Sequence, residues 1–184
     1  MYRVLVADPP WAFKDTLPGP KRGAEKHYPV MKTEDICKMA LPPMADDCVL
    51  FLWRVASMQQ DALDVMKAWG FKLKTEIVWL KKTKTGKRHF GMGRIVRAEH
   101  EVCLVGTFGK PQIRPTSKNI RSTFSTEEEE GAFEAEAVRR HSAKPETFYE
   151  IVEDLYEGPY FEMFARQRLV GWDADGLEVD RKVW

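Results

Sequence analysis

Tyr2-Arg3-Val4-Leu5-Val6-Ala7 runs directly into Asp8-Pro9-Pro10-Trp11, so an apolar stretch ends in a carboxylate, two prolines and an indole. A stretch that is apolar along nearly its whole length is typical of an interior parallel strand with both faces covered. Each proline fixes φ and lacks an N–H group, so we expect the carbonyls of Asp8 and Pro9 to face outward. The stretch therefore predicts a buried first strand that ends in an acceptor site for a flat ring bearing an amine.

Length and composition indicate a single domain over residues 1–184, with room for a substantial core. The net charge of +1 gives no global signature of a nucleic-acid binder, which leaves only a local basic patch. Cys37, Cys48 and Cys103 lack the spacing of a zinc site or a disulfide framework, which favours a reduced, cytoplasmic compartment. No signal peptide and no apolar segment of membrane-spanning length is evident, so we expect no membrane association.

Segments of strand character alternate with segments of helical character along the chain. Thr33 is expected as the N-cap of one helix that stops before Pro42, and Gly70 ends a second helix that begins at Ser57. We expect strands over residues 48–53, 71–80, 102–105, 133–138 and 160–164, and helices over residues 33–41, 57–69 and 145–156.

This alternation predicts an α/β fold, with an open, mostly parallel sheet flanked by helices. Ligands of such sheets bind outside the carboxyl ends of the strands. Asp8 and Arg166 both follow an expected strand and would lie at that edge.

Three segments are expected to be flexible loops that meet the substrate, over residues 14–28, 81–97 and 111–130. The second has no acidic residue and contains Lys81, Lys82, Lys84, Lys87, Arg88, Arg94 and Arg97. Such a run is often only solvated surface, but its composition also suits contact with the phosphates of a nucleic acid. The third begins basic and ends in four glutamates at 127–130.

Several motifs in order along the chain resemble the MT-A70 family of S-adenosylmethionine-dependent adenine N6-methyltransferases. They are Asp8-Pro9-Pro10-Trp11, Leu50-Phe51-Leu52-Trp53, Glu76-Ile77-Val78-Trp79, His100-Glu101-Val102-Cys103 and Glu162-Met163-Phe164-Ala165-Arg166. The resemblance extends over almost the whole chain. It implies a Rossmann-like methyltransferase fold with circularly permuted motifs, in which the catalytic strand comes first and the cofactor strand last.

The resemblance also implies roles for individual residues. The catalytic residues would be Asp8, Pro9, Pro10 and Trp11, with Trp11 and Tyr28 lining the base pocket beside the seven basic residues of the loop at 81–97. The cofactor would be held by Asp8, Lys144, Glu162, Phe164, Arg166, Arg168 and Glu178. Two positions depart from the family: Leu177 stands where asparagine is common, and Arg168 where a histidine can be found.

The expected chemistry is direct transfer of the methyl group of S-adenosylmethionine to the N6 amine of adenine, with no metal. That amine is a poor nucleophile, because its lone pair is delocalised into the ring. The Asp8 carboxylate and the Pro9 carbonyl can accept its hydrogens and localise the lone pair toward the methyl group, and positioning alone supplies several kcal/mol of the barrier. The base must be flipped out of a duplex or come from a single strand.

DNA is the expected polymer because the chain is compact and lacks appended RNA-binding modules, and RNA is the alternative. A homodimer would present more surface to either polymer. Two other hypotheses stay open: a non-catalytic methyltransferase-like subunit that binds nucleic acid, and an enzyme that methylates an amine of a protein or small molecule. The intact Asp8 and Trp11 argue against both.

Overall fold

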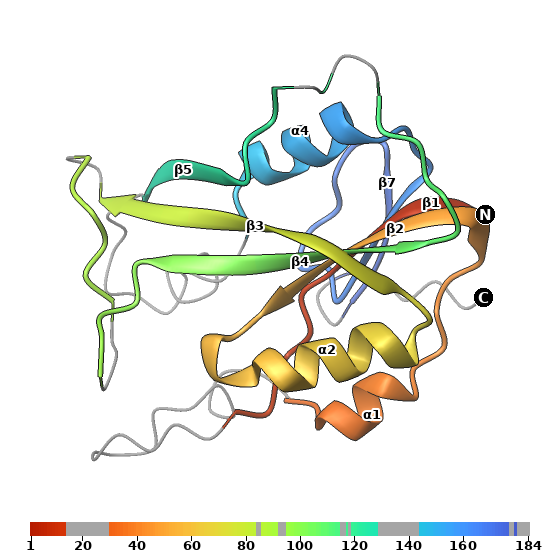
Figure 1. The fold of residues 1–184 in the computed structure, drawn as a ribbon, viewed down its shortest axis with the longest axis horizontal. Helices are drawn as coiled ribbons and strands as arrows, with labels where there is room; N and C mark the ends of the chain where they lie inside the picture. The colour runs from red at the N-terminus through yellow and green to blue at the C-terminus, as the bar shows by residue number, and fades with distance from the viewer. Residues whose placement is uncertain are drawn as a thin grey trace.

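The computed structural model describes residues 1–13, 30–83, 86–91, 95–114, 117, 119–128, 144–176 and 179 (Figure 1). In chain order its elements are β1 (Tyr2–Ala7), α1 (Thr33–Cys37), β2 (Met44–Arg54), the 3-10 helix η2 (Ala56–Met58), α2 (Gln59–Ala68), β3 (Lys72–Thr83), β4 (His100–Phe108), β5 (Thr123–Glu128), α4 (Glu146–Leu155), β6 (Tyr160–Met163) and β7 (Trp172–Asp175).

The described strands form one seven-stranded sheet in the order β5-β3-β4-β2-β1-β6-β7. Strand β1 is parallel to β2 and β6, and β7 is parallel to β6. Strand β4 is antiparallel to both of its neighbours, β2 and β3, and β5 is parallel to β3. The prediction of a mostly parallel, Rossmann-like sheet is therefore confirmed.

Helices cover both faces of this sheet, as Figure 1 shows. Leu5 and Ala7 of β1 pack into the core on the side of α1 and α2. Val4 and Val6 pack into the second core, against Phe148 of α4. Because β1 alternates between two fully buried faces, its almost uninterrupted apolar sequence is explained.

The expected N-cap at Thr33 is wrong, because Thr33 is the first residue inside α1 and Lys32 is the cap. The Thr33 hydroxyl instead donates a 2.6 Å hydrogen bond to the Asp61 carboxylate of α2, which joins the two helices. Helix α1 is also short and ends at Cys37, five residues before Pro42. The contact between Thr33 and Asp61 therefore outweighs the preference of threonine for the N-cap position.

Two edge strands were not predicted from the sequence. Residues 123–128, expected within a loop, form β5, and residues 172–175 form β7. Both are short, and β5 carries few apolar residues, as edge strands often do. The strand expected over 133–138 lies outside the described residues.

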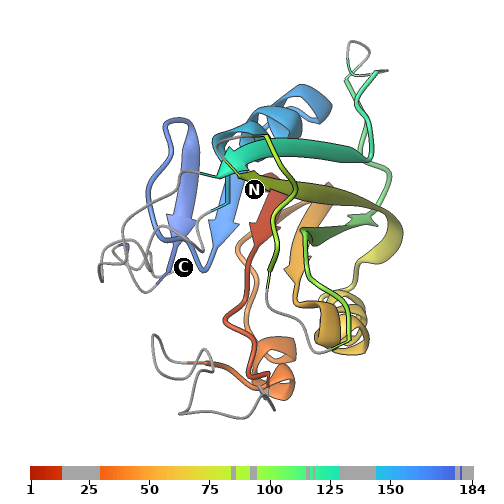
Figure 2. The same cartoon turned by 90° about the vertical axis from the view of Figure 1, so that its left-hand side faces the viewer.

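Strand β1 lies between β2 and β6, where the connections of the sheet diverge to opposite faces. One neighbour, β2, follows α1 on one face of the sheet, and the other, β6, follows α4 on the opposite face. Figure 2 shows β1, β6 and β7 ending side by side with the same direction. In α/β sheets a ligand site forms outside the carboxyl ends at such a switch point, which here is the position of Asp8 and Phe164.

Candidate active site

The segment that follows β1 is fixed by backbone hydrogen bonds. The Trp11 N–H group donates to the Pro9 carbonyl at 2.8 Å, and the Met31 N–H group donates to the Pro10 carbonyl at 2.8 Å. Ala12 N–H donates in turn to the Met31 carbonyl at 3.0 Å. The tetrapeptide is thus held by the residues that lead into α1, and the Pro9 oxygen keeps one lone pair for another donor.

Trp11 lies in the core and not at the surface. It is 3% exposed and packs in the core on the α1 and α2 side. Its indole N–H group donates to the Trp53 carbonyl at 3.1 Å. In this conformation the ring anchors the loop after β1, so its expected contact with a base stays a prediction.

Lys144 holds the carboxylate at the end of β1. It directly precedes Pro145, the N-cap of α4, and its ammonium lies 2.6 Å from Asp8 Oδ2. The same ammonium lies 4.9 Å from the centre of the Trp53 ring. Only 7% of the Lys144 side chain is exposed, so this ion pair is largely shielded from water.

A second carboxylate extends the ion pair into a chain of four alternating charges. Glu101, near the start of β4, lies 3.3 Å from the Lys144 ammonium and 2.6 Å from that of Lys81 at the end of β3. The chain therefore runs Lys81, Glu101, Lys144, Asp8 across the carboxyl edge of the sheet.

The charges in this chain stabilise one another. Burial lowers the pKa of Lys144, but the carboxylates of Asp8 and Glu101 outweigh it and hold that pKa above its usual range. Burial likewise raises the pKa of Glu101, while Lys144 and Lys81 bring it below its usual range. Lys144 is therefore a permanent cation that positions Asp8 and is not suited to accept a proton.

A different pair of groups forms the opposite wall. Glu162 of β6 is buried, and its Oε1 accepts a 2.7 Å hydrogen bond from the Tyr149 hydroxyl of α4. Burial raises the pKa of Glu162 to about 7; the Tyr149 hydrogen bond opposes this rise and the Asp8 charge adds to it. Burial, followed by the nearby Glu162 charge, also raises the pKa of Tyr149.

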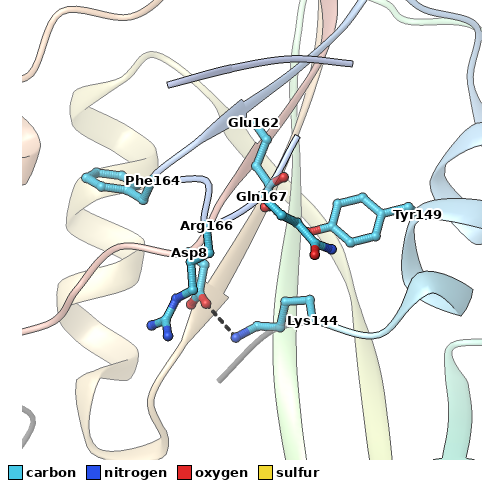
Figure 3. A pocket seen from close by; sticks show the side chains of 7 residues that line it. All are labelled: Asp8, Lys144, Tyr149, Glu162, Phe164, Arg166 and Gln167. Carbon is cyan, nitrogen blue, oxygen red and sulfur yellow. Dashed lines mark hydrogen bonds and ion pairs between the residues drawn. The ribbon is translucent and has the colours of Figure 1, made fainter. Parts of the chain in front are cut away.

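These groups line one hollow, shown in Figure 3. Lys144 reaches Asp8 in that view while Tyr149 points toward Glu162. The lining residues are Asp8, Lys144, Tyr149, Glu162, Phe164, Arg166 and Gln167. Phe164 has a φ of 63°, a left-handed backbone conformation that is strained for an aromatic residue and is concentrated at functional sites.

The structure thus brings together most of the residues predicted to hold a cofactor: Asp8, Lys144, Glu162, Phe164 and Arg166. Arg168 is exposed and is not among the residues that line the hollow. Glu178 and Leu177 lie outside the described residues, and so does Tyr28.

The predicted basic residues divide into two groups. Lys81 is ion-paired with Glu101 and lies 4.7 Å from the centre of the Trp79 ring, so it is part of the chain of charges that ends at Asp8. Lys82 is partly buried, whereas Lys87, Arg88 and Arg97 are exposed on the connection between β3 and β4. Lys84 and Arg94 lie outside the described residues.

Sequence reasoning missed Glu101, Tyr149 and Gln167. Glu101 opposes Trp79 in the β3–β4 ladder, and it reaches the site because β4 is antiparallel and begins at the edge where β1 ends. Had that reversal been foreseen, a glutamate at the start of β4 would have been a candidate.

Two features are absent from the described part of the chain. No group of three or more histidine, cysteine or carboxylate side chains is placed there to hold a metal ion. No helix in that part is both long and apolar enough to cross a membrane. The three cysteines are free thiols.

Comparison with known proteins connects this geometry to a family. The chain is 27% identical over 202 residues to the type II methyltransferase M.MunI of Mycoplasma sp., covering 99% of this chain and 80% of that protein. It is 28% identical over 184 residues to the N(6)-adenosine-methyltransferase catalytic subunit METTL3 of Homo sapiens, covering 97% of this chain and 28% of METTL3. For the MT-A70-like N(6)-adenosine-methyltransferase of Drosophila melanogaster, the identity is 28% over 184 residues, with 97% of this chain and 27% of the relative covered.

The chain therefore spans about a quarter of the length of the METTL3-like relatives and most of the length of M.MunI. The family model named MT-A70 matches residues 2–178, which include every described element of the sheet and both walls of the hollow. This protein belongs to the MT-A70 family, as its sequence predicted.

Proposed function

We propose that this protein transfers the methyl group of S-adenosylmethionine to the N6 amine of adenine in nucleic acid, with DNA as the polymer. The observation that carries the proposal is the Asp8 carboxylate, fixed by Lys144 at the switch point of an MT-A70 sheet and opening into a lined hollow. RNA is the alternative polymer.

The residues around the hollow fit S-adenosylmethionine. Arg166 suits the carboxylate of its amino-acid moiety, and Glu162 suits a positively charged or hydrogen-bonding group. Asp175, at the carboxyl end of β7 beside β6, has a buried Oδ1 without a hydrogen-bond partner. An acidic side chain at the end of the neighbouring strand is where a Rossmann-like sheet binds ribose hydroxyls, so this orphan oxygen has a natural partner in the cofactor.

The bound cofactor supplies an electrophilic methyl group, and the protein positions the amine. The Asp8 carboxylate, restrained by Lys144, accepts one amine hydrogen, and the free lone pair of the Pro9 carbonyl accepts the other. Both acceptors are held before substrate arrives, by an ion pair and by the bonds of the segment after β1. The N6 ammonium formed by transfer is acidic and releases its proton without a strong base.

The choice between DNA and RNA is supported by the names of the relatives and not by the geometry of the hollow. The chain matches four fifths of a relative named a type II methyltransferase, which supports DNA. Other relatives are named for adenosine, a ribonucleoside, which keeps RNA as the alternative. The predicted homodimer awaits a sedimentation measurement.

One experiment tests the activity and the polymer together. The protein is incubated with S-adenosylmethionine and with unmethylated native DNA, heat-denatured DNA or RNA, and N6-methylated nucleosides are then quantified by mass spectrometry after digestion. We expect product on DNA. Product on none of the three substrates would overturn the proposal, and product on RNA alone would replace DNA with RNA.

The role of Asp8 is tested by Asp8→Ala and Asp8→Asn. Both should reduce turnover by at least about a thousandfold, because the amine loses its charged acceptor. Calorimetric binding of S-adenosylmethionine should persist in Asp8→Asn, which shows that the hollow is intact. Turnover at the wild-type rate in either variant contradicts the assigned role.

A further inference from the structure

Three large apolar side chains stand exposed on one connection of the sheet. The β3–β4 loop, residues 84–99, is described at 86–91 and 95–99. Phe90 is 74% exposed, Ile95 95% and Val96 75%. Isolated exposed apolar residues are ordinary, but three within seven positions of one loop are a feature to explain.

The loop presents these side chains on a hydrogen-bonded frame. Thr83 N–H donates to the Lys87 carbonyl at 2.8 Å, and His89 N–H donates to the Lys81 carbonyl at 3.0 Å. Gly91 N–H donates to the Ala98 carbonyl at 3.0 Å, and a Cβ atom at Gly91 would collide with that carbonyl oxygen. Phe90 therefore projects from a segment whose two sides are tied together.

The surroundings of the apolar side chains are basic. Residues 81–97 contain no aspartate or glutamate. The Arg97 guanidinium lies 4.8 Å from the centre of the Phe90 ring. Lys87 and Arg88 are exposed in the same loop, and Arg88 lies 3.4 Å from Glu99 at the loop's end. Exposed apolar side chains surrounded by cations complement a partner that has an anionic exterior and an apolar interior. A nucleic-acid duplex, with phosphates outside and stacked bases inside, has that arrangement.

The loop leaves the sheet at the edge where the site lies. Strand β3 has the same direction as β1, because both β2 and β3 are antiparallel to β4 and β2 is parallel to β1. Figure 1 shows the loop extending beyond the carboxyl end of β3, and this is the side that faces the viewer in Figure 2. At its base, Lys81 is connected through Glu101 and Lys144 to Asp8.

We propose that the β3–β4 loop is a wedge for duplex DNA. Phe90, Ile95 and Val96 enter the base stack beside the target adenine, while Lys87, Arg88 and Arg97 contact the flanking phosphates. The wedge fills the space that the adenine leaves when it turns out of the helix toward Asp8. This inference rests on the proposed function and adds to it the strandedness of the substrate.

The physical role of the wedge is to offset the cost of extrusion. Removing a base from a duplex costs a few kcal/mol of pairing and stacking, and inserted apolar side chains recover part of that stacking. A single strand carries no such cost, because its bases are already accessible. The wedge therefore matters for duplex substrate and hardly at all for a single strand.

The test compares native with heat-denatured unmethylated DNA, so the recognition sequence need not be known. The variants are Phe90→Ala and the double substitution Ile95→Ser with Val96→Ser. All three positions are exposed, so folding should be unaffected, as circular dichroism and thermal melting will verify. The matched control is Leu73→Ser, which is 48% exposed and lies near the amino end of β3, away from the loop.

We expect methylation of native DNA to fall at least about tenfold in the wedge variants, with methylation of denatured DNA within about twofold of wild type. Leu73→Ser should match wild type on both substrates. Equal losses on native and denatured DNA, or no loss on either, would overturn the wedge. Wild-type activity confined to single strands or RNA would do so as well, whereas no wild-type activity on any polymer is the failure of the proposed function itself.

The alternative partner for the exposed apolar side chains of the loop is a second copy of the chain. Sedimentation of wild-type protein and of the double variant decides between the two. If wild type is a dimer and the variant a monomer, the apolar side chains form a contact between copies and the wedge is refuted.

Discussion

Two glutamates have pKa values displaced in opposite directions: Glu162 lines the hollow beside Tyr149, and Glu101 supports the Asp8 wall through its ion pair with Lys144. Glu101 lies between two ammonium groups, at 2.6 Å and 3.3 Å, and its pKa is below the usual range. Glu162 is buried with a neutral phenol as its hydrogen-bond donor, and its pKa is raised to about 7. The same side chain is therefore held ionised on one wall and close to half-protonated at neutral pH on the other.

The difference shows how one small site separates two tasks. The raised pKa of Lys144 and the lowered pKa of Glu101 keep these two neighbours of Asp8 ionised near neutral pH. Glu162 accepts a hydrogen bond from a neutral phenol, so burial dominates its pKa, and its charge depends on pH and on what binds. A positively charged ligand there would favour the ionised form.

Removing the shared cation should have the largest effect. Lys144→Met leaves Asp8 without its ion-pair partner and Glu101 with Lys81 alone, because Lys144 contacts both carboxylates. We expect the free energy of unfolding at neutral pH to fall by about 3 kcal/mol and kcat to fall at least about a hundredfold as Asp8 moves. Urea denaturation and steady-state kinetics measure the two losses.

Lys144→Arg is the matched control for charge, since it keeps a cation while changing its shape. It should retain most of the stability lost in Lys144→Met, with an intermediate kcat. If Lys144→Met were as stable and active as wild type, the ionic chain would have no part in positioning Asp8.

The second prediction concerns the pH dependence of stability that Glu162 causes. Its pKa is raised from 4.5 to about 7 on folding, so the folded state binds this proton more tightly than the unfolded state. The resulting stability is present below pH 4.5 and is lost as the pH rises through about 7, by up to about 3 kcal/mol. Glu162→Gln should remove that decline from the pH profile of urea unfolding.

Glu101→Gln is the control from the other wall. Because the pKa of Glu101 is lowered in the folded protein, its contribution is present above the ordinary pKa and is lost as the pH falls through the folded value. This variant should alter the acidic part of the profile and leave the decline near pH 7. An unchanged neutral decline in Glu162→Gln would assign that decline to another group.

On each wall, sequence could predict one residue and not its partner. Asp8 directly follows the apolar strand β1 and Glu162 lies near the end of the apolar strand β6, each in a recognisable motif, so their position at the carboxyl edge follows from the parallel sheet. Glu101 and Tyr149 reach the site only through the direction of β4 and the docking of α4, which are tertiary facts. The antiparallel pairing of β4 leaves no mark in its own sequence, because a buried strand is apolar in either direction.

Trp11 illustrates the same limit for a residue inside a motif. Its proximity to Asp8 was evident, but the side on which its ring packs depends on the bonds between residues 9–13 and Met31 and on the Trp53 carbonyl. Edge strands β5 and β7 were missed for a related reason, since a short strand with one covered face carries a weak apolar signal. Sequence therefore predicts the strands at the centre of the sheet better than its edges and its site contacts.

The smallest expected effect isolates the hydrogen bond on the Glu162 wall. Tyr149→Phe removes the hydroxyl that donates to Glu162 at 2.7 Å while preserving the ring that packs against Trp172 and Phe148. Losing this bond should cost about 1 kcal/mol. Since the bond opposes the rise in the Glu162 pKa, its loss should also move the neutral decline in stability to higher pH.

Tyr156→Phe provides the control, because Tyr156 is a buried tyrosine at the end of the same helix whose hydroxyl donates no hydrogen bond to Glu162. Its decline should stay at the wild-type pH. A shift in both variants would show that any change in α4 perturbs Glu162 through packing. A shift in Tyr149→Phe alone would show that a single neutral donor sets the charge of this wall, just as Lys144 and Lys81 set the charge of the other.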